Sequence, residues 1–420
     1  MSRFKGTVAL VATACVAIVG AAQTGRKDTS PPPSAAVDTN VNDPVARLEK
    51  RLETGEVSFS YEPGHGYLRA VLDALHVPVS SQTLVFSKTS FQYAQISAAA
   101  PRALYFNDDV YVGQVHDGKF LELASFDPRR GAIFYLVDER QSERPRFQRT
   151  ASECVKCHVA SSTRGVPGVM LRSLFTKPSG FPVAGMRSFV TGQESPIGER
   201  WGGWYVSARG GAKIGMGHAI VSGVEYPGEA LDTSAYLTGS SDIVALMVLA
   251  HQTQMHNLIT QTNYRTRLAL SANGGTMAGM SDASHKQFED PAEQLVRYLL
   301  FTNEARLDGA VAGDSGFTHE FAARGPFDSR GRSLRQFDLH ARIFRYPCSY
   351  LIYSETFDAI PQPAKQYIYR RLFEVLSGAD QSAEFRTLSA EDRRAILEIL
   401  VDTKPGVPPE WRQCVRVPRD

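Results

Sequence analysis

Two cysteines and a histidine form the most informative pattern in the chain, Cys154-Val155-Lys156-Cys157-His158. Two thiols three positions apart on one short helical turn can each form a thioether with one vinyl group of a haem, and the adjacent imidazole can then bind the iron. The pattern therefore predicts one covalently bound haem c. Cys154 and Cys157 would hold the porphyrin, and His158 would be the proximal iron ligand.

Other uses of a Cys-x-x-Cys pair have less support. A thiol redox pair usually sits in a thioredoxin-like βαβ context, which the sequence lacks. A closed zinc site needs two further ligands, yet Cys348 and Cys414, the cysteines outside both the motif and the N-terminal apolar run, stand alone. Those two cysteines can form a disulfide after export or remain buried thiols, because sequence does not give their separation.

The first 22 residues predict export. Arg3 and Lys5 precede an uncharged, apolar run from Gly6 to Ala22 that ends in small residues. This is typical of a secretory signal peptide, and its length is at the short end for a membrane anchor. The expected location is periplasmic or otherwise extracytoplasmic, with membrane contact only if the segment stays uncleaved. In bacteria haem is attached covalently outside the cytoplasm, so export and the motif agree.

The motif resembles the haem-attachment site of c-type cytochromes, with Cys154 and Cys157 at the thioether positions and His158 at the proximal position. The presence of one such motif distinguishes the chain from the di-haem cytochrome c peroxidases. Segments 105–113, 199–206 and 344–350 look like those of large, uncharacterised, exported bacterial proteins with a single motif. This resemblance implies haem binding and no particular activity.

The sixth iron ligand decides between electron transfer and reaction with small ligands. Met216 lies in a glycine-flanked loop, where the backbone can approach a macrocycle closely, and we expect it to be the distal ligand. Its rivals are His218, the helical residues His251 and Met255, and the nearer methionines Met170 and Met186. The alternative for the helix that carries His251 is that its apolar residues form a stripe in the core and its histidines are partly exposed, with no iron bound.

Three arginines follow the motif and can pair with haem propionates: Arg164, Arg172 and Arg187. A surface position is the more common explanation for each, because arginine is mostly exposed in proteins. Trp201 and Trp204 flank Gly202-Gly203, which predicts a bend or a close approach of two backbones.

The predicted fold is α+β, because strands and helices occur in separate runs. Residues 1–22 are the signal or anchor, 23–42 a Pro/Ser/Thr-rich linker, 43–150 a β-rich region, 151–235 a Gly-rich haem segment and 236–420 a helical region. Expected helices cover 43–53, 67–76, 243–259, 291–303, 364–376 and 390–401, and expected strands cover 83–86, 103–106, 110–113, 120–123 and 132–136. Asp108-Asp109 is interpreted as a turn between two strands.

Net charge and missing motifs argue against several other classes of function. The formal net charge of the 420 residues is +2, so no overall field favours nucleic acid. Neither a phosphate-binding loop nor a His-Glu-x-x-His pattern occurs. We expect a single-haem protein that passes electrons to a redox partner. The alternatives are a haem-dependent oxidoreductase, peroxidase or gas-ligand sensor with an open distal site, and a binding protein whose haem is structural.

Overall fold

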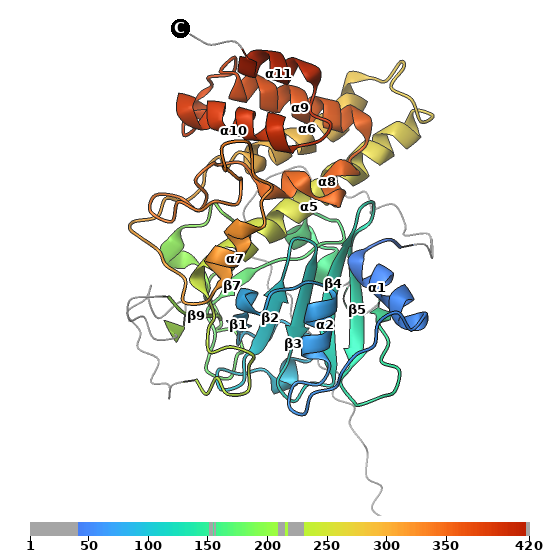
Figure 1. Cartoon of the computed structure of the whole chain (residues 1–420), viewed down its shortest axis with the longest axis vertical. Coiled ribbons are helices and arrows are strands. Elements are labelled where there is room, and N and C mark those ends of the chain that lie inside the picture. The colour runs from blue at the N-terminus through green and yellow to red at the C-terminus, as the bar shows by residue number, and fades with distance from the viewer. Residues whose placement is uncertain (1–40, 151–153, 155–156, 209–214, 217–230, 417–420) are drawn as a thin grey trace, which may run out of the picture. The chain divides into compact units, whose positions relative to one another are not determined.

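The computed structural model describes residues 41–150, 154, 157–208, 215–216 and 231–416 (Figure 1). The predicted signal or anchor and most of the predicted linker lie outside these residues. The fold is mixed α+β, as the sequence predicts: a β-rich N-terminal half is followed by a helical C-terminal half (Figure 1).

A six-stranded antiparallel sheet organises the N-terminal half. Its strands follow one another in sequence order as a meander: β1 (Thr83–Val85), β2 (Arg102–Phe106), β3 (Val110–Gln114), β4 (Phe120–Asp127), β5 (Gly131–Asp138) and β6 (Gln148–Thr150). The expected turn at Asp108-Asp109 connects β2 to β3. Strand β6 was not expected from the sequence; it is a short edge strand whose residues are mostly exposed.

Both faces of the sheet are buried, and side chains alternate between two cores. One face contributes Tyr105, Val112 and Tyr135 to a core that it shares with α1 (Pro44–Glu53) and α2 (Leu68–Ala74). The other face contributes Phe126 and Phe134 to the main core. The main core continues into the C-terminal helices, so the two halves of the chain share it.

Helix α5 (Ile243–Ala272) is the element that joins the halves. Asp242 caps it by accepting hydrogen bonds from the backbone N–H groups of Val244 and Ala245, which satisfies donors that a helix start leaves unpaired. The helix is buried on nearly all sides over its first twenty residues, since the sheet and α6 (Asp282–Leu299) both pack against it. Its histidines are fully buried. The expectation of partly exposed histidines was wrong because it considered only one apolar stripe.

The remaining helices pack on α6 or on one another, toward the top of Figure 1. They are α9 (Gln362–Leu376), α10 (Ala390–Thr403) and α11 (Pro409–Arg416), while the shorter α7 (Phe317–Ala323) and α8 (Glu355–Asp358) pack against α5. The predicted helix at 291–303 begins nine residues earlier, and Pro291 lies inside it. Ser281 caps that earlier start, so the proline did not mark the first turn.

Among the described residues of the predicted haem segment the strands are short: β7 (Arg172–Leu174) with β8 (Ser188–Val190), and β9 (Tyr205–Val206) with β10 (Gly215–Met216). The predicted close approach at Gly202-Gly203 is confirmed. A Cβ on Gly202 would lie 2.8 Å from the Leu174 carbonyl oxygen, and Gly203 has a φ of +84°.

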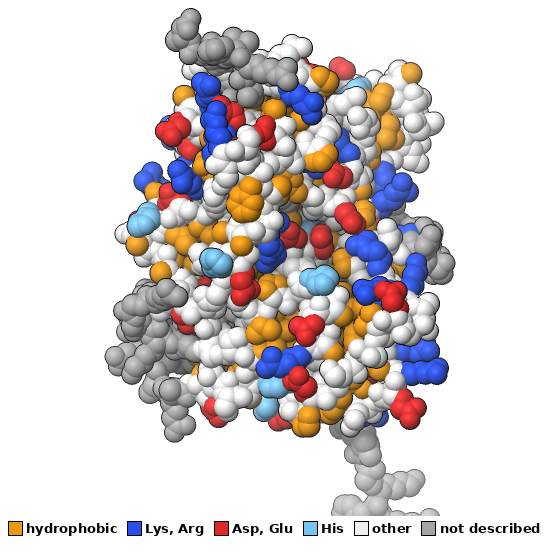
Figure 2. All heavy atoms as spheres, viewed as in Figure 1, with side chains coloured by type: hydrophobic (Ala, Val, Ile, Leu, Met, Phe, Trp, Pro, Cys, Tyr) orange, Lys and Arg blue, Asp and Glu red, His pale blue; other side chains and the backbone are white. Residues whose placement is uncertain are grey.

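Acidic and basic side chains are interspersed on the face shown in Figure 2. Within the described ranges, no helix has both the length and the apolar character needed to cross a membrane.

Candidate functional site

The motif residues occupy a helical backbone beside the main core. Cys154, Cys157 and His158 are all helical, as the motif requires. Cys154 is half-buried and packs against the main core, whereas Cys157 is exposed. Neither thiol forms a disulfide. One thiol therefore faces the protein and the other faces solvent on the same stretch of chain.

The imidazole of His158 is held by the backbone of Gly168. The Nδ1–H donates to the Gly168 carbonyl oxygen at 2.8 Å, and because a carbonyl can only accept, Nδ1 must carry the proton. The Gly168 N–H donates in return to the His158 carbonyl oxygen at 3.0 Å. Thr163 Oγ1 donates to the same oxygen at 3.1 Å. His158 is thus fixed at both its ring and its backbone.

Nε2 of His158 makes no hydrogen bond among the described residues. In the neutral ring with its proton on Nδ1, this nitrogen carries the lone pair. The ring centroid lies 4.7 Å from that of Phe134 on β5. Burial lowers the pKa of His158, and the hydrogen bond to Gly168 only partly opposes this. The neutral form, the one that binds metals, is therefore favoured.

A half-buried ion pair lies on the same face of the sheet. Arg102 on β2 contacts Glu122 on β4 at 2.6 Å. The guanidinium crosses the strand between them at Gly113, where a Cβ would overlap it. Glu122 is paired in register with Leu136, two residues beyond Phe134 on β5. Both charges act on the His158 imidazole, Arg102 lowering its pKa and Glu122 raising it.

These residues fit a covalently attached haem. The cysteines at the two attachment positions can form the thioethers, and the neutral imidazole has a fixed tautomer and, among the described residues, an unbonded Nε2 that can bind the iron. A hydrogen bond from the second ring nitrogen to a backbone carbonyl is the usual support of a metal-binding histidine. Among the described residues no group of three His, Cys, Asp or Glu side chains is arranged to hold a bare metal ion.

The three predicted propionate arginines are dispersed. Arg164 turns through a left-handed conformation and donates to Gln294 on α6 at 3.2 Å, while its Nε is buried without a partner. Arg172 and Arg187 are exposed on the β7–β8 hairpin. Arg172 donates to Ser188, and Arg187 pairs with Glu199. Of the three, only Arg164 keeps a buried donor group without an acceptor.

The predicted distal ligands fall into two groups. Met216 lies in β10, where its backbone pairs with Tyr205, but its side chain and all of His218 lie outside the described residues. His251 and Met255 are described, and both are fully buried in α5.

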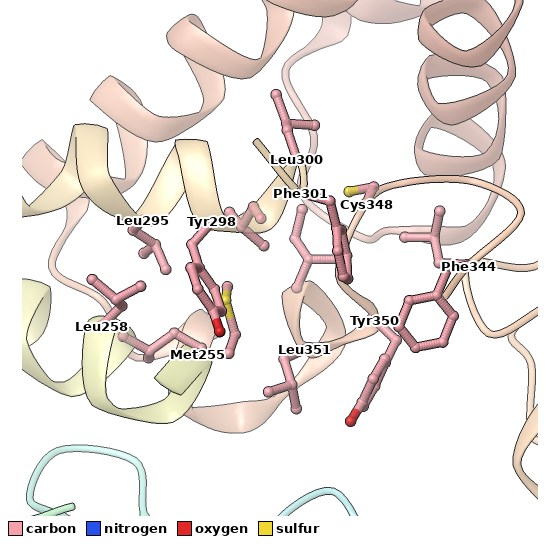
Figure 3. Packing of buried hydrophobic residues seen from close by; sticks show 14 of the residues in the cluster. Met255, Leu258, Leu295, Tyr298, Leu300, Phe301, Phe344, Cys348, Tyr350 and Leu351 are labelled. Carbon is pink, nitrogen blue, oxygen red and sulfur yellow. The ribbon is translucent and has the colours of Figure 1, made fainter. Parts of the chain in front are cut away.

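The His251 ring has both nitrogens engaged. Nδ1 bonds Gln193 Oε1 at 2.7 Å and Nε2 bonds the Ser349 hydroxyl at 2.8 Å. Burial lowers the pKa of His251 to about 3, with a smaller contribution from His256. Met255 lies among Leu258, Leu295 and Tyr298 in the main core (Figure 3). In this arrangement His251 has no nitrogen left for a metal, and Met255 fills space between α5 and α6.

The remaining methionine and cysteine residues named from the sequence lie in different environments. Met170 is half-buried and Met186 is 49% exposed. Cys348 is fully buried and forms no disulfide. Of the two states expected for this residue, a disulfide or a buried thiol, the structure has the buried thiol. The Cys414 side chain lies outside the described residues.

Four residues around His158 were not anticipated from the sequence: Gly168, Asn257, Arg102 and Glu122. A Pro167-Gly168 turn signal ten residues after His158 could have suggested that the chain returns to it. Nothing in the local pattern points to the other three, which come from a distant helix and from two strands of the sheet.

Comparison with protein-family models, with curated proteins and with solved structures found no match to this chain.

Proposed function

We propose that the protein is an exported, single-haem c-type protein that transfers electrons. In this proposal Cys154 and Cys157 hold the haem covalently and His158 binds its iron. The protein would work in the periplasm or another extracytoplasmic compartment with a redox partner.

One observation carries the proposal: the ring of His158 donates from Nδ1 to Gly168, while Nε2 bonds none of the residues that the structure describes. A histidine that merely filled the core would be expected to engage or hide both nitrogens, as His251 does. Among the described residues His158 instead keeps one ring nitrogen unbonded, on the same helical stretch as the thiols of Cys154 and Cys157. The bound haem would supply a one-electron redox centre.

The chain's own residues would orient and tune that centre. Gly168 fixes the imidazole tautomer and makes the ring a stronger donor. Phe134 limits the water that reaches one side of the ring. Arg102 and Glu122 place a pair of opposite charges on the neighbouring strands.

The main alternative keeps the same haem but leaves its distal position open for a small ligand. The commitment of His251 and Met255 to other contacts favours this alternative over ligation by α5. Ligation by Met216 remains our proposal for the electron-transfer function, since the glycine-flanked backbone there permits close approach.

Covalent attachment is tested first. The chain is produced with the bacterial haem-attachment machinery, and free haem is extracted from the denatured protein. We expect the mass of the polypeptide to increase by one haem and the alkaline pyridine spectrum to be that of haem c. Cys157→Ala should abolish the double attachment. Cys348→Ala, which removes a thiol outside the motif, should leave it intact. A wild-type chain without attached haem would refute the proposal.

Carbon monoxide distinguishes electron transfer from the open-site alternative. A ferrous protein with a strong distal ligand should bind carbon monoxide slowly or not at all, and Met216→Ala should then accelerate binding. Rapid binding by the wild-type protein, unchanged by Met216→Ala, would favour a sensor or an oxidoreductase.

A further inference from the structure

Asn257 is a fully buried polar side chain of α5 that clamps the haem segment. Its Oδ1 accepts a hydrogen bond from the Val169 backbone N–H at 3.1 Å. Its Nδ2 donates to the Val169 carbonyl oxygen at 2.8 Å. One amide thus pairs both backbone groups of a residue 88 positions away, as a neighbouring strand would.

The clamp is continuous with the support of His158. Val169 follows Gly168 directly, and Gly168 exchanges two hydrogen bonds with His158. Gly168 has no room for a side chain, because a Cβ there would overlap the Asn257 amide oxygen. The contacts therefore run without a break from α5 through Val169 and Gly168 to the imidazole.

The sheet holds the same segment from its other side. The Ala132 N–H at the start of β5 donates to the Pro167 carbonyl oxygen at 3.0 Å. A Cβ on Gly131 would overlap that oxygen. Residues 167–169 are consequently fixed between β5 and α5, and the Gly168 carbonyl has little freedom to move relative to the His158 ring.

We infer that Asn257 is a positioning residue for the haem iron, acting through Val169, Gly168 and the Nδ1–H of His158. This inference rests on the proposed haem at His158. Without the amide, both backbone groups of Val169 lose buried partners, the segment relaxes and the hydrogen bond to Nδ1 weakens. A more weakly supported imidazole donates less electron density to the iron, so reduction becomes more favourable.

The test measures the reduction potential of the haem-bearing protein carrying Asn257→Leu, which removes the amide and keeps the same branching at Cγ. Asn263→Leu is the matched control. Asn263 lies on the same helix, is also buried, and donates to the Pro128 and Ala359 carbonyl oxygens, away from the haem segment. Both variants should lower the unfolding temperature, but only Asn257→Leu should change the potential.

We expect Asn257→Leu to favour reduction about tenfold, which is about 59 mV for a one-electron couple. Asn263→Leu should leave the potential unchanged. Gly168→Ala supplies a second variant should Asn257→Leu fail to fold, and it should shift the potential in the same direction because its methyl group displaces the clamp.

Equal potentials in wild type, Asn257→Leu and Asn263→Leu would overturn the inference while leaving the proposed function intact. Equal shifts in the two asparagine variants would also overturn it, because they would reflect general loosening of α5. Absence of attached haem from the wild-type chain would instead overturn the proposed function, and the inference with it.

Discussion

Asp109, at the turn between β2 and β3, carries a buried carboxylate oxygen without a hydrogen-bond partner. Burial, together with the negative charges of Asp108 and Glu355, raises the pKa of Asp109 to about 7, although Arg47 and Arg335 oppose the change. The folded protein therefore prefers a protonated Asp109, while the unfolded chain ionises near the ordinary value of 3.8.

The sign of the effect on stability follows from proton binding. Between pH 3.8 and about 7 the folded state holds a proton that the unfolded state has lost, so stability falls as pH rises through this window. Above pH 7 the loss is complete and constant. Each pH unit between the two pKa values is worth about 1.4 kcal/mol, which gives an upper limit of about 4 kcal/mol. Because the residue is half-buried, we expect a stabilisation of about 1–2 kcal/mol when the charge is removed.

Asp109→Asn should therefore increase the free energy of unfolding at pH 8 and change it little at pH 4. Urea denaturation at several pH values between 4 and 8, with the slope and midpoint fitted at each, measures the difference. Asp108→Asn is the control. Asp108 is paired with Arg335 and Arg324, so its neutralisation should destabilise the protein at pH 8. An Asp109→Asn effect that is equal at all pH values, or destabilising at pH 8, would refute the reasoning.

Three further predictions concern charges and a helix cap. Glu122→Gln leaves the Arg102 charge unbalanced beside the proposed haem. The substitution should raise the reduction potential by tens of millivolts, since the interaction of a nearby charge with the iron is worth about 1–2 kcal/mol at an effective dielectric constant of about 20. Spectroelectrochemistry measures the potential, and a lowered value would contradict this prediction. Arg393 donates to four backbone carbonyl oxygens around the start of α10. Arg393→Met should cost on the order of 3 kcal/mol in urea denaturation because those acceptors lose their partner, and a loss below about 1 kcal/mol would count against this. Ser389 forms a capping box with Asp392, so Ser389→Ala should cost about 1 kcal/mol; an unchanged thermal midpoint would show that the cap is dispensable.

Features that depend on neighbouring residues were predicted well from the sequence. The helices that Asp242 and Ser389 cap begin at Ile243 and Ala390, as their predicted ranges have it, because a cap needs only the next three backbone N–H groups. The five expected strands form one meander in sequence order, because short polar turns favour pairing between consecutive strands.

Predictions failed where tertiary packing outweighed a local rule. Pro291 was expected to begin a helix, yet α6 starts at Asp282 and buries the proline within it. His251 and His256 were expected to be partly exposed, yet the sheet and α6 enclose α5 from opposite sides. A single-helix pattern shows one apolar face and cannot reveal a second packing partner.

The sequence by itself determined the chemistry that the site can offer. Two thiols and an imidazole at positions 154, 157 and 158 need only one helical turn to come together, so their spacing is sufficient. Only the tertiary structure decided how the imidazole is held: a carbonyl ten residues away fixes its tautomer, and an amide 88 residues beyond Val169 fixes that carbonyl's segment. Such contacts arise from burying the haem segment between β5 and α5, where each backbone group must find a partner that no local pattern specifies.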